Sequence, residues 1–95
     1  MRRVRLTPEA ERTLGAQIDY LMQISPGAAA NLVTRVEQFL TETVALWPRA
    51  GRYIPPHDLW ETWIPGTRLV VWYVFTEDEI VAVTFWHTAQ DRHRS

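Results

Sequence analysis

The chain lacks two residue types that carry much of protein chemistry. It has no cysteine among its 95 residues, and its ten lysine-or-arginine positions are all arginine. The absence of cysteine excludes disulfides, thiolate nucleophiles and zinc sites built on sulfur. The absence of lysine excludes Schiff-base catalysis and a lysine general base, because arginine stays protonated. The function must therefore use other polar side chains or a binding surface.

An excess of charge of one sign is also missing. The arginines stand against 11 acidic residues, which gives a formal net charge of −1. A protein that binds nucleic acid by charge alone carries a large positive excess, so that class is excluded, although a local basic patch is allowed. The longest apolar run, from Leu69 to Phe75, is too short to span a membrane. Because no apolar leader follows Met1, we expect a cytoplasmic protein without a membrane partner.

The first half of the chain predicts a strand and two helices. Residues 3–6 alternate polar and apolar, as a half-buried strand does. Thr7 and Pro8 are typical of a helix start, and an apolar stripe follows at helical spacing: Ala10, Leu14, Ile18, Leu21 and Met22. Residues 25–27 (Ser-Pro-Gly) end this helix and start a second, whose stripe continues to Trp47. So short a turn predicts an antiparallel helical hairpin.

The second half of the chain predicts strands. Residues 49–58 hold a glycine and two prolines and are expected to form a loop. Strands are expected over 59–64, 68–75 and 80–87, and the uninterrupted apolar run of 68–75 marks the central one. The order β-α-α-β-β-β predicts a single α+β domain over residues 1–95. Its two layers are a helical hairpin and the antiparallel sheet on which that hairpin packs.

The turn between the last two strands suggests their register. If Phe75 pairs with Ile80, then Arg68 lies opposite His87 at the same end of the sheet. Alternation gives two apolar faces, of which the helices cover one; the other is expected to be covered by the tail or open to a partner. One face carries Val70, Trp72, Val74, Val81, Val83 and Phe85. The other carries Leu69, Val71, Tyr73, Phe75, Ile80, Ala82, Thr84 and Trp86.

Polar residues are expected to gather at this end of the sheet. Asp91 and Arg92 follow His87 closely in the chain, and Arg52 lies in the loop that leads to the strands. With Arg68, this group would suit phosphate or carboxylate. The plainer alternatives are that each arginine is solvated or paired with an acid, and that His87 bonds a backbone carbonyl at the sheet edge.

One chemistry stays open for these residues. RNA cleavage by 2′-hydroxyl attack needs a base, an acid and a cation, and His87 with Arg68 supplies part of that set. The chain has no helical metal-ligand spacing, no phosphate-binding loop, no dinucleotide-binding glycine motif and no nucleophile elbow. We therefore expect no cofactor and no metal.

Several segments, taken in order, resemble the RelE/ParE superfamily of bacterial toxins from type II toxin–antitoxin systems. They are residues 6–10 (LTPEA), 25–29 (SPGAA), 46–52 (LWPRAGR), Arg68 at the start of the central strand, and 87–92 (HTAQDR). The resemblance covers nearly the whole chain and implies the fold predicted above. It also implies a growth-inhibiting toxin in a hetero-oligomer with a cognate antitoxin, a segment of which wraps over the apolar surface.

The superfamily implies two mechanisms. RelE-like members cleave mRNA on the ribosome with lysines and arginines on a strongly basic surface, whereas ParE-like members inhibit DNA gyrase and are not nucleases. The near-zero charge and the missing lysines favour the ParE-like branch. Some nucleases of the superfamily use histidine, glutamate and arginine instead, and Arg68, His87, Glu61 and Arg52 match that pattern in part. A degenerate, non-toxic module that only binds antitoxin is a third alternative.

We therefore expect a ParE-like inhibitor of DNA gyrase, with the ribosome and mRNA as the alternative target. The residues expected to face the target are Arg52, Arg68, His87, Asp91 and Arg92. Hydrophobic residues of the hairpin and the sheet are expected to bind the antitoxin, and these are Leu14, Ile18, Leu21, Trp72 and Trp86.

Overall fold

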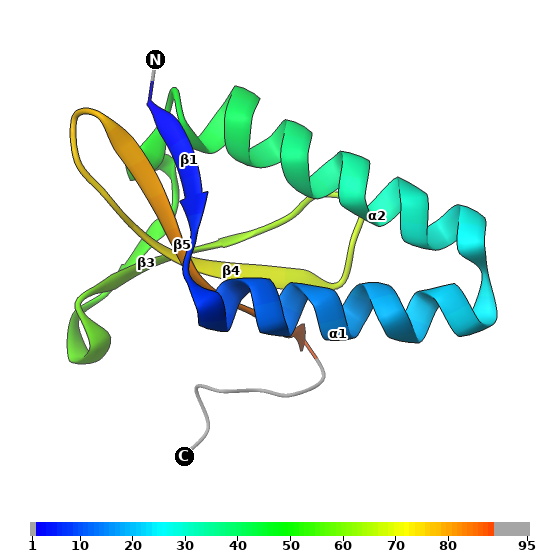
Figure 1. Cartoon of the computed structure of the whole chain (residues 1–95). Helices are drawn as coiled ribbons and strands as arrows, with labels where there is room; N and C mark the ends of the chain where they lie inside the picture. Colours follow the sequence, from blue (N-terminus) through cyan, green and yellow to red (C-terminus); the bar gives the residue numbers. More distant parts are fainter. Residues whose placement is uncertain (1, 89–95) are drawn as a thin grey trace.

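A helical hairpin covers one face of a five-stranded sheet in the computed structural model, which describes residues 2–88 (Figure 1). The elements in chain order are β1 (Arg3–Leu6), α1 (Pro8–Ile24), α2 (Pro26–Gln38), β2 (Arg52–Ile54), β3 (Leu59–Trp63), β4 (Leu69–Phe75) and β5 (Glu79–His87). The predicted two-layer α+β fold is confirmed. Within residues 2–88, no helix combines the length and the apolar character needed to cross a bilayer.

Both helices begin where the sequence predicts, because hydroxyl side chains cap their first turns. Thr7 Oγ1 accepts a hydrogen bond from the Ala10 amide at 3.1 Å, and Ser25 Oγ accepts one from the Ala28 amide at 3.2 Å. Ser25 also closes α1, since its own amide donates to the Leu21 carbonyl at 2.7 Å. A single residue thus joins the helices and makes them an antiparallel hairpin.

The second helix changes its winding before its apolar stripe ends. After α2 the chain continues as a π-helical segment, Phe39–Val44, which has more residues per turn than an α-helix. Leu40 and Val44 of this segment stay in the core, whereas Trp47 lies beyond its end and is 67% exposed. Met22 is 52% exposed, since it lies on the flank of the α1 stripe while Leu21 packs inward. The predicted places of Trp47 and Met22 in the buried stripes were therefore wrong.

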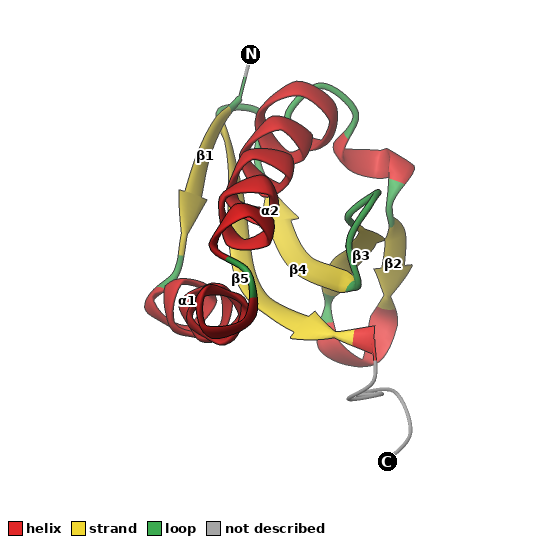
Figure 2. Ribbon diagram, turned by 90° about the vertical axis from the view of Figure 1, so that its right-hand side faces the viewer, coloured by secondary structure: helices red, strands yellow, loops and turns green. Residues whose placement is uncertain are grey.

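The strands run in the order β1-β5-β4-β3-β2, with β4 at the centre as predicted (Figure 2). The first strand lies at the edge beside β5 and runs parallel to it, with Val4 opposite Ile80. All other neighbouring strands are antiparallel. The sheet is thus mixed, although most of it has the predicted antiparallel form.

A short strand replaces part of the loop predicted over residues 49–58. Tyr53 in β2 lies opposite Trp60 in β3, and the two ring centres are 5.5 Å apart. Such aromatic pairs stabilise an antiparallel ladder. Three residues are too few to show alternation in a sequence, and Pro55 follows the strand directly. The loop prediction was wrong for this reason.

A β-bulge changes the register expected for β4 and β5. Phe75 pairs with Ile80 as predicted, but the pairing shifts by one residue further along the two strands. Leu69, rather than Arg68, therefore lies opposite His87. The predicted direct pairing of Arg68 with His87 was wrong.

The bulge also exchanges the two faces of β5. Its extra residue is Val83, and each side chain beyond it points to the face opposite to the one predicted. Phe85 packs in the core beneath the helices, while Trp86 packs with Val70 and Trp72 on the other face. The predicted faces of Phe85 and Trp86 were wrong.

Two threonines of the first helix region satisfy the backbone at the bulge. Thr7 Oγ1 donates to the Val83 carbonyl at 2.7 Å, and the Phe85 amide donates to Thr13 Oγ1 at 3.0 Å. These side chains supply partners where the ladder is interrupted, which a buried backbone requires. The helix therefore helps to set the register of the strand that it covers.

Among residues 2–88, Tyr73 is the one polar member of the largest fully buried side chains, and we expect it to make the fold sensitive to alkaline pH. Its hydroxyl donates to the Pro48 carbonyl at 2.5 Å. Burial raises the pKa of Tyr73 to about 12, which outweighs the lowering effect of a backbone hydrogen bond at Gly51. Since the folded pKa lies above the ordinary 10.0, this stabilisation is complete below pH 10 and is lost as the pH rises towards 12.

We expect the free energy of unfolding to fall by roughly 2 kcal/mol across this pH window. Urea unfolding on either side of the window measures the loss. In Tyr73→Phe the pH dependence should largely disappear, at a constant cost of about 1 kcal/mol for the missing buried hydrogen bond. The same alkaline loss in both proteins would show that another group causes it.

Candidate functional site

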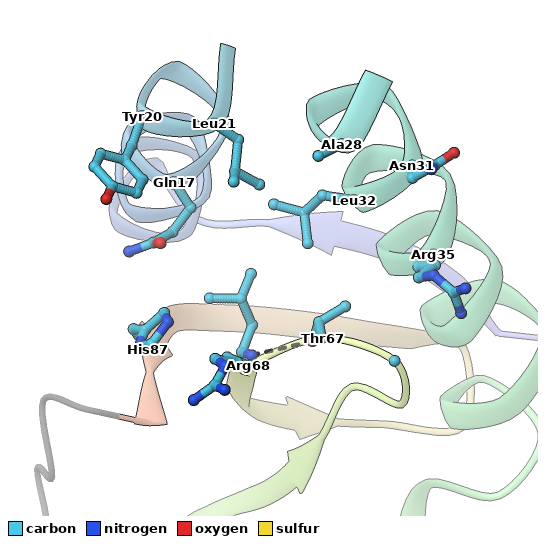
Figure 3. A pocket seen from close by; sticks show the side chains of 12 residues that line it. Gln17, Tyr20, Leu21, Ala28, Asn31, Leu32, Arg35, Thr67, Arg68 and His87 are labelled. Carbon is cyan, nitrogen blue, oxygen red and sulfur yellow. Dashed lines mark hydrogen bonds between the residues drawn. The ribbon is translucent and has the colours of Figure 1, made fainter. Parts of the chain in front are cut away.

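A cleft opens between the helical hairpin and the end of the sheet where β4 begins and β5 ends (Figure 3). Its volume is about 580 Å³. Residues of α1 and α2 line one side, and the turn between β3 and β4 together with the strand ends lines the other. The lining residues are Gln17, Tyr20, Leu21, Ala28, Asn31, Leu32, Arg35, Gly66, Thr67, Arg68, Leu69 and His87.

Arg35 of α2 rests directly on the turn between β3 and β4. Gly66 in this turn has a φ of 77°, a left-handed conformation that favours glycine. A Cβ atom at Gly66 would lie 2.5 Å from Nη1 of Arg35. Thr67 closes the turn, because its Oγ1 donates to the Ile64 carbonyl at 2.7 Å and accepts from the Leu69 amide at 3.0 Å. Glycine at this position thus allows the left-handed backbone of the turn and also leaves room for the guanidinium group of Arg35.

Arg68 and His87 lie at adjacent strand ends on the opposite side of the cleft from the helices. The Thr88 amide donates to the Arg68 carbonyl at 2.9 Å, which ties the start of β4 to the end of β5. His87 lies opposite Leu69 and lines the cleft together with Arg68. The structure therefore brings Arg68 and His87 together as expected, although the register is not the expected one.

The cleft has a cationic rim and an apolar interior. Among residues 2–88, no aspartate or glutamate lines the cleft. The side chains of Arg35 and Arg68 make no hydrogen bond or ion pair with any residue of the described range 2–88. A guanidinium group binds carboxylate or phosphate through two parallel hydrogen bonds. Because leucine side chains line the same cleft as the two arginines, the cleft suits a ligand that carries an anionic group beside an apolar one.

Arg52 and Glu61 lie elsewhere on the sheet. They face each other across β2 and β3, and Glu61 lies opposite Trp72 of β4. Trp72 is four residues along β4 from the position of Arg68, which corresponds to about 13 Å of extended strand. The expectation that Arg52 reaches the same sheet end was wrong, because it belongs to β2 and not to a loop.

Glu61 belongs to a cluster on the face of the sheet that the helices do not cover. The Trp72 indole Nε1 donates to Glu61 Oε2 at 2.8 Å. The His57 ring lies against the same indole, with ring centres 5.0 Å apart. These contacts fix the carboxylate far from His87, so Glu61 is not placed to act as a base beside it.

The hydrophobic residues expected at the antitoxin interface are largely occupied inside the chain. Leu14, Ile18 and Leu21 are half-buried and pack against the core. Trp72 is only 7% exposed and Trp86 only 5%, so both offer little surface to a partner. Of these five residues, Leu21 alone lines the cleft. Asp91 and Arg92, expected to face the target, lie outside the described residues.

Four polar residues of the cleft do not stand out in the sequence: Gln17, Tyr20, Asn31 and Arg35. A weak signal exists for α2, because Ala28, Asn31 and Arg35 follow at helical spacing along the flank of its apolar stripe. Among residues 2–88, no group of three or more histidine, aspartate and glutamate side chains is arranged to hold a metal ion.

Comparison with known proteins assigns the chain to a family. Residues 4–92 match the model of the ParE toxin of the type II toxin–antitoxin system parDE. The chain belongs to the ParE toxin family. This agrees with the branch of the RelE/ParE superfamily that the missing lysines favour. None of the curated proteins compared with this ParE-family chain is significantly similar to it.

A solved structure supports the same fold. This ParE-family chain superposes on a chain of the chromosomal ParDE toxin–antitoxin system from P. aeruginosa with a TM-score of 0.73 and 20% sequence identity. The match covers 92% of this chain and 96% of the other. At that identity the likeness establishes the common fold, and the roles of individual residues must be argued from the present structure.

Proposed function

We propose that this ParE-family chain is a toxin that poisons DNA gyrase and is neutralised by a cognate antitoxin. The separation of the candidate nuclease residues carries the choice of target. Arg68 and His87 line the cleft, whereas Arg52 and Glu61 lie about 13 Å away along the sheet. A general base must come within hydrogen-bond reach of the proton that it removes. Within residues 2–88, a site for RNA cleavage at Arg68 and His87 would therefore lack Glu61, the carboxylate expected as its base.

The charge of the chain supports the same choice. Docking on ribosomal RNA requires neutralisation of many phosphates, and the affinity gained depends on the number of cations supplied. The chain has a net charge of −1. Two cleft arginines suffice for a local contact with an acidic protein surface, which does not need an overall basic charge.

The antitoxin neutralises the toxin by covering a cleft that the target also uses. Leu21, expected to bind antitoxin, lines the same cleft as Arg68 and His87, which are expected to face the target. An antitoxin segment that places an apolar side chain near Leu21 and a carboxylate near the arginines would cover both target-facing residues. The antitoxin then prevents target binding by occupying the site, without any change in the fold.

Two parallel assays test the proposed target. The purified chain is added to DNA gyrase in a supercoiling assay and to ribosomes that carry mRNA. We expect loss of supercoiling that the antitoxin reverses, and intact mRNA. Cleavage of ribosome-bound mRNA that His87→Ala abolishes would instead establish the nuclease alternative. Antitoxin binding without an effect in either assay, and without growth inhibition on expression, would establish a non-toxic binding module.

A further inference from the structure

Two arginines share one aromatic ring at the end of β4 that lies away from the cleft. The guanidinium carbon of Arg2 is 5.6 Å from the centre of the Phe75 ring, and that of Arg49 is 5.4 Å from it. Both distances fall in the range of cation–π attraction. The ring thus holds two positive charges together at one place, where they would otherwise repel each other.

The two arginines differ in whether their side chains already make hydrogen bonds within the protein. Arg2 is fixed, since its Nε donates to the Thr76 carbonyl at 2.6 Å and its Nη1 donates to the Ala45 carbonyl at 3.2 Å. Arg49 is exposed, and within residues 2–88 its side chain makes no hydrogen bond or ion pair. The N–H groups of its guanidinium are therefore available to donate hydrogen bonds to a carboxylate of a partner.

Large apolar side chains stand beside these charges. Leu46 is 48% exposed and Trp47 is 67% exposed, although the Trp47 amide is held by a 2.8 Å hydrogen bond to the Thr43 carbonyl. Beside Leu46 and Trp47 lies a hollow of about 330 Å³. We call this hollow, together with the residues around its rim, the Trp47 surface. It is lined by Arg2, Leu46, Trp47, Pro48, Arg49 and Ala50.

Charge and composition indicate the occupant of the Trp47 surface. No acidic side chain of the described residues lines the hollow, so a symmetric contact with a second copy would set arginine against arginine. Nucleic acid is disfavoured by the net charge of −1. Tryptophan and arginine are the residues that most often dominate the energy of protein–protein contacts. A partner protein with an acidic residue next to an apolar one fits best.

We propose that the Trp47 surface is a second docking site, separate from the cleft, for an acidic and partly apolar segment of the target. This inference rests on the proposed function, in which that target is DNA gyrase. Leu69 lines the cleft and Phe75 lies six residues further along β4, which is about 20 Å of strand. An antitoxin segment that fills the cleft does not need to reach so far, whereas an enzyme much larger than the toxin can contact both places.

Binding measurements on two variants test this inference. Trp47→Ala and Arg49→Glu alter exposed side chains, and Arg3→Glu is the control, since Arg3 is exposed and makes no side-chain hydrogen bond or ion pair within residues 2–88. The affinity of each protein for purified gyrase and for the antitoxin is measured, and thermal unfolding confirms that each variant is folded. We expect Trp47→Ala and Arg49→Glu each to weaken gyrase binding at least about tenfold. Antitoxin binding should stay within about twofold, and Arg3→Glu should bind both partners like the parent.

The outcomes separate this inference from the proposed function. If the parent chain binds gyrase and both variants bind it equally well, the Trp47 surface is not a docking site, while the proposed function stands. If the variants lose antitoxin and keep gyrase, the surface belongs to the other partner and the inference is wrong. If the parent chain itself does not bind gyrase, the proposed function and this inference fail together.

Discussion

Replacement of Gly51 by alanine should destabilise the fold by about 3 kcal/mol. A Cβ atom at this position would lie 2.3 Å from the Tyr73 hydroxyl oxygen and 2.8 Å from the Glu61 carbonyl oxygen. Neither neighbour can move easily, because Tyr73 is 1% exposed and Glu61 is in the middle of β3. The backbone itself is not the obstacle, since the φ of Gly51 is −74°. The cost is therefore steric, and it includes damage to the buried hydrogen bond between Tyr73 and Pro48.

Gly15→Ala is the matched control for this substitution. A Cβ atom at Gly15 meets no heavy atom within 4 Å, and the residue lies inside α1. Alanine is favoured over glycine in a helix by up to about 1 kcal/mol, so this variant should be slightly more stable than the parent. Urea unfolding of the three proteins gives the comparison. A Gly51→Ala protein as stable as the parent would mean that β2 and the segment before it do not pack on Tyr73 as described.

Reversal of the charge at Arg68 should impair both proposed activities of the cleft. In Arg68→Glu we expect the affinity for gyrase and for the antitoxin each to fall at least about tenfold, because a charge-assisted hydrogen bond contributes about 1.5 to 3 kcal/mol and repulsion adds to its loss. The fold should persist, since the Arg68 side chain has no partner among residues 2–88 and its carbonyl bond to Thr88 involves the backbone alone. Isothermal titration with each partner measures the change.

The Arg68 result is interpreted against Arg3→Glu, which makes the same change of charge on an exposed edge strand. Loss of gyrase binding alone would mean that antitoxin and target use different surfaces. Loss of antitoxin binding alone would also mean that the two partners use different surfaces, with Arg68 then belonging to the surface that binds the antitoxin. Either outcome would refute a shared cleft, whereas an equal effect of Arg3→Glu would show that only the overall charge matters.

The elements predicted correctly are those with a local cause. Thr7 and Ser25 predict the starts of the two helices, because the hydroxyl group of each accepts a hydrogen bond from an amide only three residues further along the chain. The central strand is recognisable because its apolar run is buried on both faces. Sequence reasoning also brought Arg68 and His87 to one end of the sheet, since a short turn limits how far adjacent strands can slip.

The features that were missed depend on contacts between distant segments. The bulge at Val83 is supported by Thr7 and Thr13, which lie about seventy residues earlier in the chain, and no pattern within β5 announces it. Arg35 reaches the cleft only because Gly66 leaves room for its guanidinium group. A three-residue strand such as β2 is likewise too short for alternation to show. Each of these depends on tertiary packing and not on local preference.

The most direct test of a shared cleft is the affinity of gyrase for the chain with and without saturating antitoxin. Occlusion of Arg68 and His87 by the antitoxin predicts an affinity at least about tenfold lower for the complex than for the free chain, with only the contact at the Trp47 surface remaining. Equal affinity of gyrase for the free chain and for its antitoxin complex would contradict the account.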